Sequence, residues 1–595
     1  MSVNGRMGED QATLDALVRR PRIIWQQIAA VVGVFIVLAG VSAVYYKNAF
    51  DSLWERESLD LAQIARSIAE GEGFTTFFLR PLNVALLADS ENPTVELNHA
   101  PLYPYTLALA FKMRSPADQV AAWVSLGFLL ATMIATYFLG KIIFDWRTGL
   151  LAAAALGVSG PVINIGILGQ QWTMAAFWLT LLLLLVALHH KSSSAERALA
   201  GAFYAAGAAL CCVLLYMTHH VFILFAIPTA IYFGITGTWR KVNLSVFLVL
   251  LVVLTAPWAY RNYLATGVPI LGANAWDLIA RTDVFPGDSL YRSTSEDNRA
   301  ISTLVLFPIE HFAAFARKLV DGSSNIALEL VRVMGIGIAG FLVVSTLYRF
   351  KSASANAVRG LTYGLVPTGI IAIALYSLEP HAVVIFAPVA AVYASSYLLL
   401  LLDAKKLHTF YKRVLVGGFL FLCGYQTIPA ILWRMPADEE KINRPAHTYF
   451  AMLASRGIKT PIFTDAPWIS AWRSRCWSAW VPTSDADFDQ FAAIGFPLRV
   501  IVLTPESKKL PADEIWHVLH TVRMWREYLK DPDSALQQIL EAARVSPKDA
   551  PAVRRYVQRL KREFAVSAAL EGFEPQPQDP LSPDYIQVFT RETEP

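Results

Sequence analysis

Two carboxylates near the start of the chain have the residue type and spacing for acid–base chemistry. Glu57 and Asp60 lie in the segment ERESLDLAQIARSIAEGEGF, in which apolar residues recur at helical spacing between Leu61 and Ile68. This pattern predicts a short amphipathic helix along a membrane surface, with both carboxylates within one turn. A carboxylate held there could accept a proton from a hydroxyl group. Alternatively, the two are only the solvated face and the N-terminal dipole partners of a short helix.

The composition indicates what kind of protein positions this helix. Of 595 residues, 55% are hydrophobic and only 16% are charged. Apolar runs of near-bilayer length recur along the chain, and a water-soluble core does not explain them. The net charge of +4 is small and spread along the chain, which argues against a nucleic-acid surface. We therefore expect a polytopic α-helical membrane protein that contacts membrane lipids and no nucleic acid.

The hydropathy pattern predicts about eleven spans. The first apolar run extends from Ile23 to about Tyr46. A signal peptide shares its basic-then-apolar order, but the run is longer than a typical signal core, which favours a retained anchor. The further spans are expected at 118–143, 149–168, 172–188, 198–217, 220–237, 243–260, 325–348, 358–378, 381–402 and 414–432.

The distribution of basic residues predicts the orientation of these spans. Alternate connections carry Lys and Arg, whereas the opposite connections, GQQW, THH and LEPH, carry neither. By the positive-inside rule, the arm 1–22 is then cytoplasmic, and the first loop 47–117 and the long loop 261–324 of the membrane module 23–432 lie outside. An odd number of spans also places the part after residue 432 outside.

Residues 433–595 have the composition of a soluble domain. The segments TPIFTDAP, LRVIVLTP and DYIQVFTRE resemble short strands, and those near 484–494, 513–526, 534–546 and 550–564 resemble helices. We expect a small extracytoplasmic α/β domain. Its segment FTDAPWISAWRSRCWSAWVP alternates Trp and Arg. These tryptophans could stack on a sugar, or they could belong to a strand pair that packs the domain against the membrane module.

The order of these motifs resembles the GT-C superfamily of integral-membrane glycosyltransferases, in particular the group related to protein O-mannosyltransferases and the lipid A aminoarabinose transferase. The residues that carry the resemblance are ESLDLAQIARSIAEGEGFTT, HAPLYP and PWAYRNY, with the order of spans over roughly 20–430. The resemblance implies a bacterial inner-membrane protein with a cytoplasmic N-terminus and a periplasmic C-terminal domain. It also implies a hexosyl- or pentosyltransferase that moves a sugar, with inversion, from a polyprenyl-phosphate donor to an extracytoplasmic glycan, lipid or protein.

The resemblance assigns the catalytic base to the first outer loop. Counting back eight residues from Ala65 places the family's catalytic position at Glu57, whereas the family's usual residue type, aspartate, favours Asp60. Both remain candidates. Gln171 stands where family members often carry Asp or Glu. Family members differ in metal use, so Mg²⁺ or Mn²⁺ is compatible with the resemblance, and its ligands are unknown.

Other candidates lie at the expected outer ends of spans and in the outer parts. For the donor phosphate they are Arg66, Arg80, His219, His220, Arg261 and His381. For the acceptor or the sugar they are His99, Tyr103, Trp468 and Trp472. Each basic candidate has an alternative as a lipid-headgroup contact or an interfacial polar residue.

Two other protein classes share some of these features. A transporter should show charges within its spans, broken helices and related halves, but the expected spans carry almost no charge and no half resembles the other. A non-catalytic envelope assembly protein would not need an acidic cluster in its first outer loop.

Overall fold

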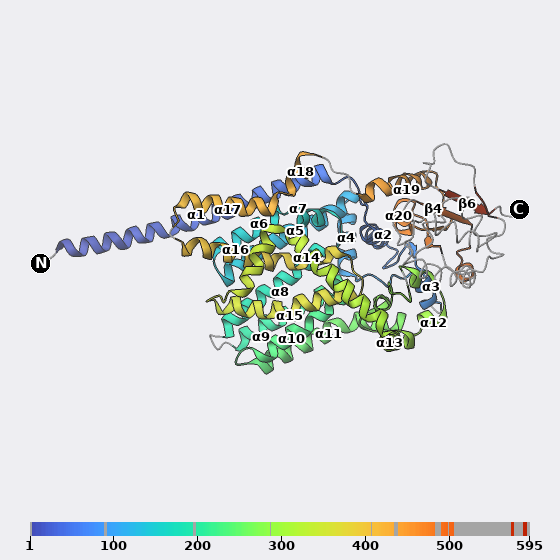
Figure 1. Cartoon of the computed structure of the whole chain (residues 1–595), viewed down its shortest axis with the longest axis horizontal. Coiled ribbons are helices and arrows are strands. Elements are labelled where there is room, and N and C mark those ends of the chain that lie inside the picture. Colours follow the sequence, from blue (N-terminus) through green and yellow to red (C-terminus); the bar gives the residue numbers. More distant parts are fainter. Residues whose placement is uncertain are drawn as a thin grey trace.

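A computed structural model describes residues 3–88, 92–193, 198–285, 287–405, 407–433, 438–481, 490–497, 499–504, 573–575 and 587–591. In this part of the chain a bundle of long helices lies at one end, and a sheet with short helices lies at the other (Figure 1). The N-terminus is at the bundle end and the C-terminus at the sheet end.

Thirteen helices form the bundle described here. Among the described residues, eight are long and apolar enough to cross a membrane, or nine spans if the bent pair α6 and α7 counts as one. The chain is a multi-pass membrane protein. The thirteen helices are α1 (Val3–Ala49), α5 (Asp118–Ile143), α6 (Trp146–Val158), α7 (Gly160–Ile167), α8 (Trp172–Ser193), α9 (Ala198–Thr218), α10 (Ala226–Ile235), α11 (Arg240–Thr266), α14 (Phe312–Leu347), α15 (Ala353–Leu375), α16 (Ala387–Ala404), α17 (Thr409–Gly424) and α18 (Thr427–Leu432).

Each of the eleven expected spans falls on one or more of these helices, but five are interrupted. The segment 325–348 is broken at Gly335, which has a non-helical backbone within α14, and the segment 381–402 begins in the 3₁₀ helix η4 (Pro380–Phe386) before α16. The segment 149–168 bends by 66° between α6 and α7, where Pro161 opens the second helix. The segment 220–237 begins as a 3₁₀ helix, η1 (His220–Phe225), before α10. The segment 414–432 is divided between α17 and α18. The segments 220–237 and 414–432 therefore consist of short helices and not of one continuous helix each. Hydropathy alone did not indicate these breaks in the backbone.

Two connections at the sheet end of the bundle fold into short elements. The first holds α2 (Arg56–Glu70), β1 (Phe78–Leu79), α3 (Pro81–Leu86) and α4 (Leu102–Met113). The second holds η2 (Gly272–Leu278), η3 (Ser289–Arg292), α12 (Glu296–Arg299) and α13 (Ile301–Glu310).

Helix α2 occupies the expected segment, but it does not lie along a membrane surface. Residues from Ser58 to Ile68 are all buried, polar ones included, because α4 and α20 (Pro467–Arg473) pack against the helix. Gly71 ends it in the left-handed conformation, with φ of 93°. The polar face of α2 is therefore inside the protein, where each polar group needs a partner.

The six described strands form one sheet in the order β1-β3-β2-β4-β6-β5. Three of them, β2 (Ile462–Thr464), β4 (Val500–Leu503) and β6 (Gln587–Arg591), fall on the three segments predicted as strands. The other strands are β1, β3 (Ser478–Trp480) and β5 (Phe573–Pro575). Helix α19 (Asp438–Ser455) begins the C-terminal part and comes before every strand except β1. The Trp/Arg segment runs from the end of β2 through helix α20 to β3, and β2 and β3 pair in parallel, so it does contain a pair of strands.

Strand β1 comes from the first connection and pairs in parallel with β3. The sheet is therefore joined through its backbone to the segment that holds Glu57 and Asp60. Four helices were expected after residue 483. The described residues cover only the end of the first one, 484–494, where 490–493 are helical. The other three lie outside the described residues.

Candidate active site

A cavity of about 280 Å³ lies between α2, the two folded connections and the end of the helical bundle. Its walls carry several carboxylates and several cations from segments far apart in the sequence. The lining residues are Arg56, Glu57, Asp60, Arg80, Asn98, His99, Trp172, His219, Asn274, Asp277, Arg281, Tyr291, Tyr376, Ser377, Leu378, Glu379 and Pro380.

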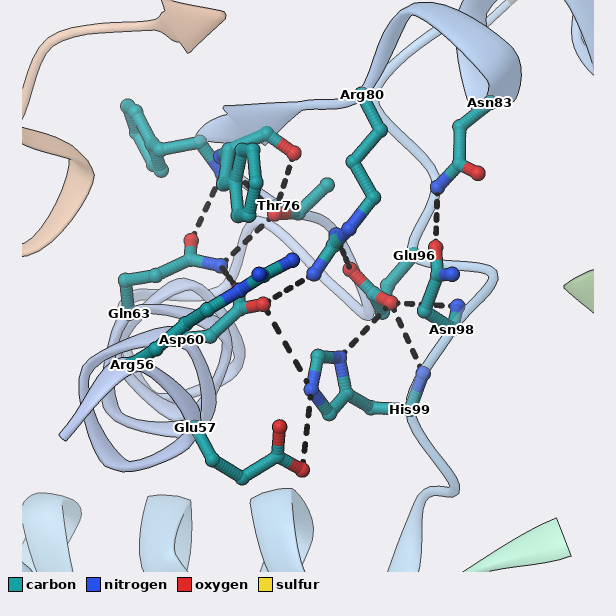
Figure 2. A network of polar contacts seen from close by, with 12 residues as sticks. Arg56, Glu57, Asp60, Gln63, Thr76, Arg80, Asn83, Glu96, Asn98 and His99 are labelled. Atoms are coloured by element: carbon teal, nitrogen blue, oxygen red, sulfur yellow. Dashed lines mark hydrogen bonds and ion pairs between the residues drawn. The ribbon is translucent and has the colours of Figure 1, made fainter. Parts of the chain in front are cut away.

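Asp60 is the centre of a buried polar network on α2 (Figure 2). Its carboxylate accepts a hydrogen bond from Gln63 Nε2 at 2.9 Å and pairs with the Arg80 guanidinium. Gln63 is itself fixed by the Thr76 hydroxyl at 2.8 Å and by the Phe77 backbone N–H. Only 2% of the Asp60 side chain is exposed, so this carboxylate is a buried counterion of Arg80.

His99 lies among three carboxylates. Its Nδ1 is 3.0 Å from Glu96 Oε1, while its Nε2 is 3.6 Å from Glu57 Oε1 and 3.7 Å from Asp60 Oδ2. Burial by itself lowers the pKa of His99, but the charges of Asp60, Glu57 and Glu96 outweigh it and hold the pKa well above its usual value. His99 is therefore a cation at neutral pH.

Glu57 is the more accessible of the two candidate bases, with 23% of its side chain exposed. Its Oε1 accepts from Gln171 Nε2 at 2.7 Å and faces His99. Burial raises the pKa of Glu57. The charge of His99 and the hydrogen bonds from His99 and Gln171 lower it by more, so that the pKa is about 2. Glu57 is therefore ionised at neutral pH and faces the cavity.

We expect stability to depend on pH through His99. Because its folded pKa is raised, its stabilising contribution is present in full below about pH 6.5 and is lost as the pH rises through the raised pKa. The melting temperature of the protein in detergent should fall as the pH is raised from 6 to 9. His99→Gln should melt lower than wild type at pH 6 and lack most of this decline. His408→Gln, at an exposed position, is the control, and an equal decline in His99→Gln would contradict the assignment.

Arg56 and Arg281 are the more exposed arginines of the cavity. Their side chains are 30% and 39% exposed, compared with 6% for Arg80. Both pair with Asp288, at 2.9 and 3.4 Å. The Arg56 guanidinium also lies 4.5 Å from the ring centroid of Trp480, which links α2 to the sheet. These two side chains are the ones best placed to meet an anion in the cavity.

Arg281 and Ser377 both have a strained backbone at the wall of the cavity. Their φ values are 55° and 52°, in the left-handed region that non-glycine residues rarely adopt. Arg281 Nη1 donates to the Ser377 carbonyl at 2.7 Å, so the two strained residues hold each other in place. Strain of this kind is concentrated at functional sites.

Glu379 provides a second kind of carboxyl group in the cavity. Its Oε2 accepts from Gln170 Nε2 at 2.7 Å and from Trp172 Nε1 at 3.3 Å. Burial, and then the negative charge of Glu57, raises the pKa of Glu379 well above its usual value. Glu379 therefore holds its proton to a higher pH than Glu57 does, and in the protonated form it can donate a hydrogen bond.

Comparison with known proteins gives a fold but no sequence relative. No family model matches the chain, and no curated protein matches it. The archaeal oligosaccharyltransferase AglB from Archaeoglobus fulgidus, in complex with an inhibitory peptide and a dolichol-phosphate, matches with a TM-score of 0.54 at 13% identity, covering 95% of this chain and 89% of that chain. ArnT from Cupriavidus metallidurans, bound to undecaprenyl phosphate, matches with a TM-score of 0.51 at 12% identity, covering 81% and 94%.

The chain has the GT-C fold. The GT-C fold and the polytopic helical architecture expected from the sequence are both confirmed. The match to AglB extends over nearly the whole chain, so the GT-C fold here includes a C-terminal part beyond the membrane bundle.

Five residues singled out in the sequence meet in the cavity of this GT-C fold. Glu57 and Asp60 come from α2, Arg80 and His99 from the first connection, and His219 from the end of α9. Gln171, expected to replace an acidic residue, donates to Glu57. Burial lowers the pKa of His219 to about 4, so it is neutral at pH 7.

The other singled-out residues do not line the cavity. Arg66 donates to the Ala471 and Trp472 carbonyls, His220 accepts from Trp258, and Arg261 donates to the Glu96 carbonyl. Tyr103 is fully buried in α4, and His381 follows the cavity residue Pro380 in η4 (Pro380–Phe386). Trp468 lies under Arg56, and Trp472 donates to Asp118.

The polar side chains of the cavity do not resemble the ligands of a metal site. Among the described residues, no group of three or more His, Cys, Asp and Glu side chains has the arrangement to hold a metal ion. The carboxylates of Glu57, Asp60 and Glu96 instead face Arg80 and His99, whose positive charges occupy the place a cation would take. We therefore assign no step of the chemistry to a metal.

Sequence reasoning missed several residues of the cavity. Arg56 and Asn98 lie next to residues that were chosen, whereas Asp277, Arg281 and Glu379 come from later connections. Asp277 and Arg281 lie in the expected outer loop 261–324, and Glu379 lies in the connection LEPH. Nothing in their local pattern indicated that they reach Glu57.

Proposed function

We propose that the chain is a glycosyltransferase that moves a sugar from a polyprenyl-phosphate donor to an acceptor outside the cytoplasm. The observation that carries the proposal is the ionised Glu57 carboxylate facing a cavity that also holds Arg56 and Arg281. The GT-C neighbours support it, since AglB is described with a dolichol-phosphate and ArnT with undecaprenyl phosphate. The cavity lies at the end of the bundle where a lipid-linked headgroup would reach it.

In this proposal Glu57 is the base and Asp60 is its buried neighbour. Within the described part of the chain, both polar contacts of the Glu57 carboxylate use Oε1, which leaves Oε2 for the acceptor hydroxyl. As the acceptor oxygen attacks the sugar carbon, its proton passes to Glu57 and the bond to the phosphate breaks, with inversion at that carbon. Arg56 and Arg281 stabilise the negative charge that develops on the leaving phosphate.

The low pKa of Glu57 is consistent with the role of a base only if binding of the donor raises it. A base with a pKa of about 2 is ionised but weakly basic. The donor phosphate is an anion, and it would share the positive charge of His99 with Glu57. The pKa of Glu57 would then rise toward the working pH, so donor binding would activate the base.

The test compares envelope glycans and lipids by mass spectrometry in a deletion strain that expresses wild type, Glu57→Gln or Glu72→Gln. Glu72 is an exposed acidic residue just after α2 and is the matched control. We expect one sugar to be missing in the deletion and with Glu57→Gln, and to be restored by Glu72→Gln. Normal glycans with Glu57→Gln, and a defect only in the deletion, would instead favour a non-catalytic envelope assembly protein.

A further inference from the structure

A second hollow lies at the opposite end of α2 from the candidate base. Two adjoining cavities, each of about 450 Å³, share Asp51, Ser52, Ala451 and Arg473. We call this hollow the basic cleft, defined by the side chains of Arg66, Arg444, Arg473, Arg475, Trp54 and Trp472. It contains none of the residues that line the candidate active site.

The basic cleft borders two membrane spans. Asp51 and Ser52 directly follow α1, which ends at Ala49, and another part of the wall, 116–119, leads into α5. Residues at the ends of membrane spans are expected at the level of lipid headgroups, where Trp and Arg are enriched. Just before this wall, α4 exposes 58% of Leu109 and 76% of Met113. The cleft therefore has an apolar surface beside it.

Arg66 is a buried cation with neutral partners. Only 2% of it is exposed, and its guanidinium donates to the Trp472 and Ala471 carbonyls at 2.8 Å each. Among the contacts of the described residues, none pairs Arg66 with a carboxylate. Burial, and then the positive charge of Arg475, lowers the pKa of Arg66 to about 10, and the more distant charges of Glu70 and Glu72 offset this only in part. A buried guanidinium without a carboxylate partner is stabilised when an anion binds next to it.

Arg473 and Asp118 form an ion pair in the wall of the same cleft. Arg473 Nη1 and Nη2 donate to the two Asp118 oxygens at 3.1 and 2.5 Å, and Trp472 Nε1 also donates to Asp118. At the rim, Arg475 is 58% exposed and lies 3.4 Å from the solvated Glu70 carboxylate. Exposed pairs of this kind are weak, so Arg475 can turn to a stronger anion.

We propose that the basic cleft binds the phosphate of an anionic membrane lipid through Arg66 and Arg475, with the acyl chains lying along the exposed face of α4. The planar guanidinium groups match phosphate oxygens in geometry. Since Arg66 belongs to α2 and Arg475 follows α20, the lipid would fasten the C-terminal part to the bilayer surface. This site is independent of the proposed transfer reaction.

The test measures lipid binding to the purified full-length chain by native mass spectrometry in detergent. Dioleoyl phosphatidylglycerol is titrated against wild type, Arg66→Lys, Arg475→Gln and Arg349→Gln, with dioleoyl phosphatidylcholine and glycerol 3-phosphate as alternative probes. Arg349 is exposed between α14 and α15, at the other end of the bundle, and is the matched control. Arg475→Gln alters an exposed side chain, so it tests the site even if Arg66→Lys fails to fold.

We expect each cleft variant to raise the Kd for phosphatidylglycerol about tenfold, as the loss of one charge-assisted hydrogen bond implies. Arg349→Gln should bind as wild type does, and phosphatidylcholine should bind more weakly. Unchanged affinity in Arg475→Gln, or an equal loss in Arg349→Gln, would overturn the proposal. Equal binding of glycerol 3-phosphate would overturn the assignment to a lipid.

Discussion

Replacing Glu57 with glutamine should lower the rate of sugar transfer by about 10²–10⁴-fold, the contribution typical of a positioned general base. The amide still fills the space of the carboxylate but cannot accept the acceptor's proton. The protein should remain folded, because the Glu57 side chain is partly exposed at the cavity. The measurement is kcat for release of polyprenyl phosphate, once the envelope comparison has identified the missing sugar.

Asp60→Asn is the informative comparison for this prediction. Asp60 is 2% exposed and neutralises Arg80, so its substitution should lower the melting temperature by more than Glu57→Gln does. Glu72→Gln should change neither quantity. If Glu57→Gln retains wild-type kcat while Asp60→Asn abolishes transfer without loss of stability, Asp60 is the base and the assignment to Glu57 is wrong.

Replacing Arg80 with methionine should destabilise the protein by about 3–5 kcal/mol, the usual effect of removing one partner of a buried ion pair. Methionine preserves much of the side chain's length but leaves the Asp60 and Glu96 carboxylates, 2% and 0% exposed, without the guanidinium between them. The melting temperature in detergent, followed by tryptophan fluorescence, should fall by several degrees. Unlike Arg56 and Arg281, Arg80 should act mainly on stability.

A surface ion pair provides the matched control for Arg80. Arg147 Nη2 lies 3.0 Å from Asp403 Oδ2, but the two side chains are 45% and 53% exposed. Arg147→Met should therefore cost at most about 1 kcal/mol. Adding Asp60→Asn to Arg80→Met should recover part of the lost stability, because it removes a buried negative charge. Equal melting of Arg80→Met and Arg147→Met would show that the network is not buried in solution.

The elements of this protein could largely be predicted from local sequence. Spans follow from runs of apolar residues, and the turn after α2 follows from the glycines of GEG, since Gly71 adopts the left-handed conformation there. Strands β2, β4 and β6 follow from short β-branched runs bounded by turn residues. These properties depend on neighbours within a few residues, so one sequence is enough to detect them.

The burial of α2 could not be predicted in the same way. The helix has an apolar stripe and a polar face, the pattern of a surface helix. Its polar face is buried because Arg80 and His99, each at least 20 residues further along, neutralise Asp60. Whether a polar face is solvated or internally paired depends on residues that the helix itself does not contain.

The sequence by itself determined that this is a polytopic membrane protein with an acidic helix in its first large connection and a GT-C order of motifs. Only the tertiary structure decided which of the two cavity carboxylates is the more exposed, brought Arg281 and Glu379 into the cavity of Glu57, and placed Arg66 in a separate cleft. The reason is physical: hydropathy and helical periodicity are local properties, whereas exposure and charge pairing arise when segments more than 200 residues apart pack together.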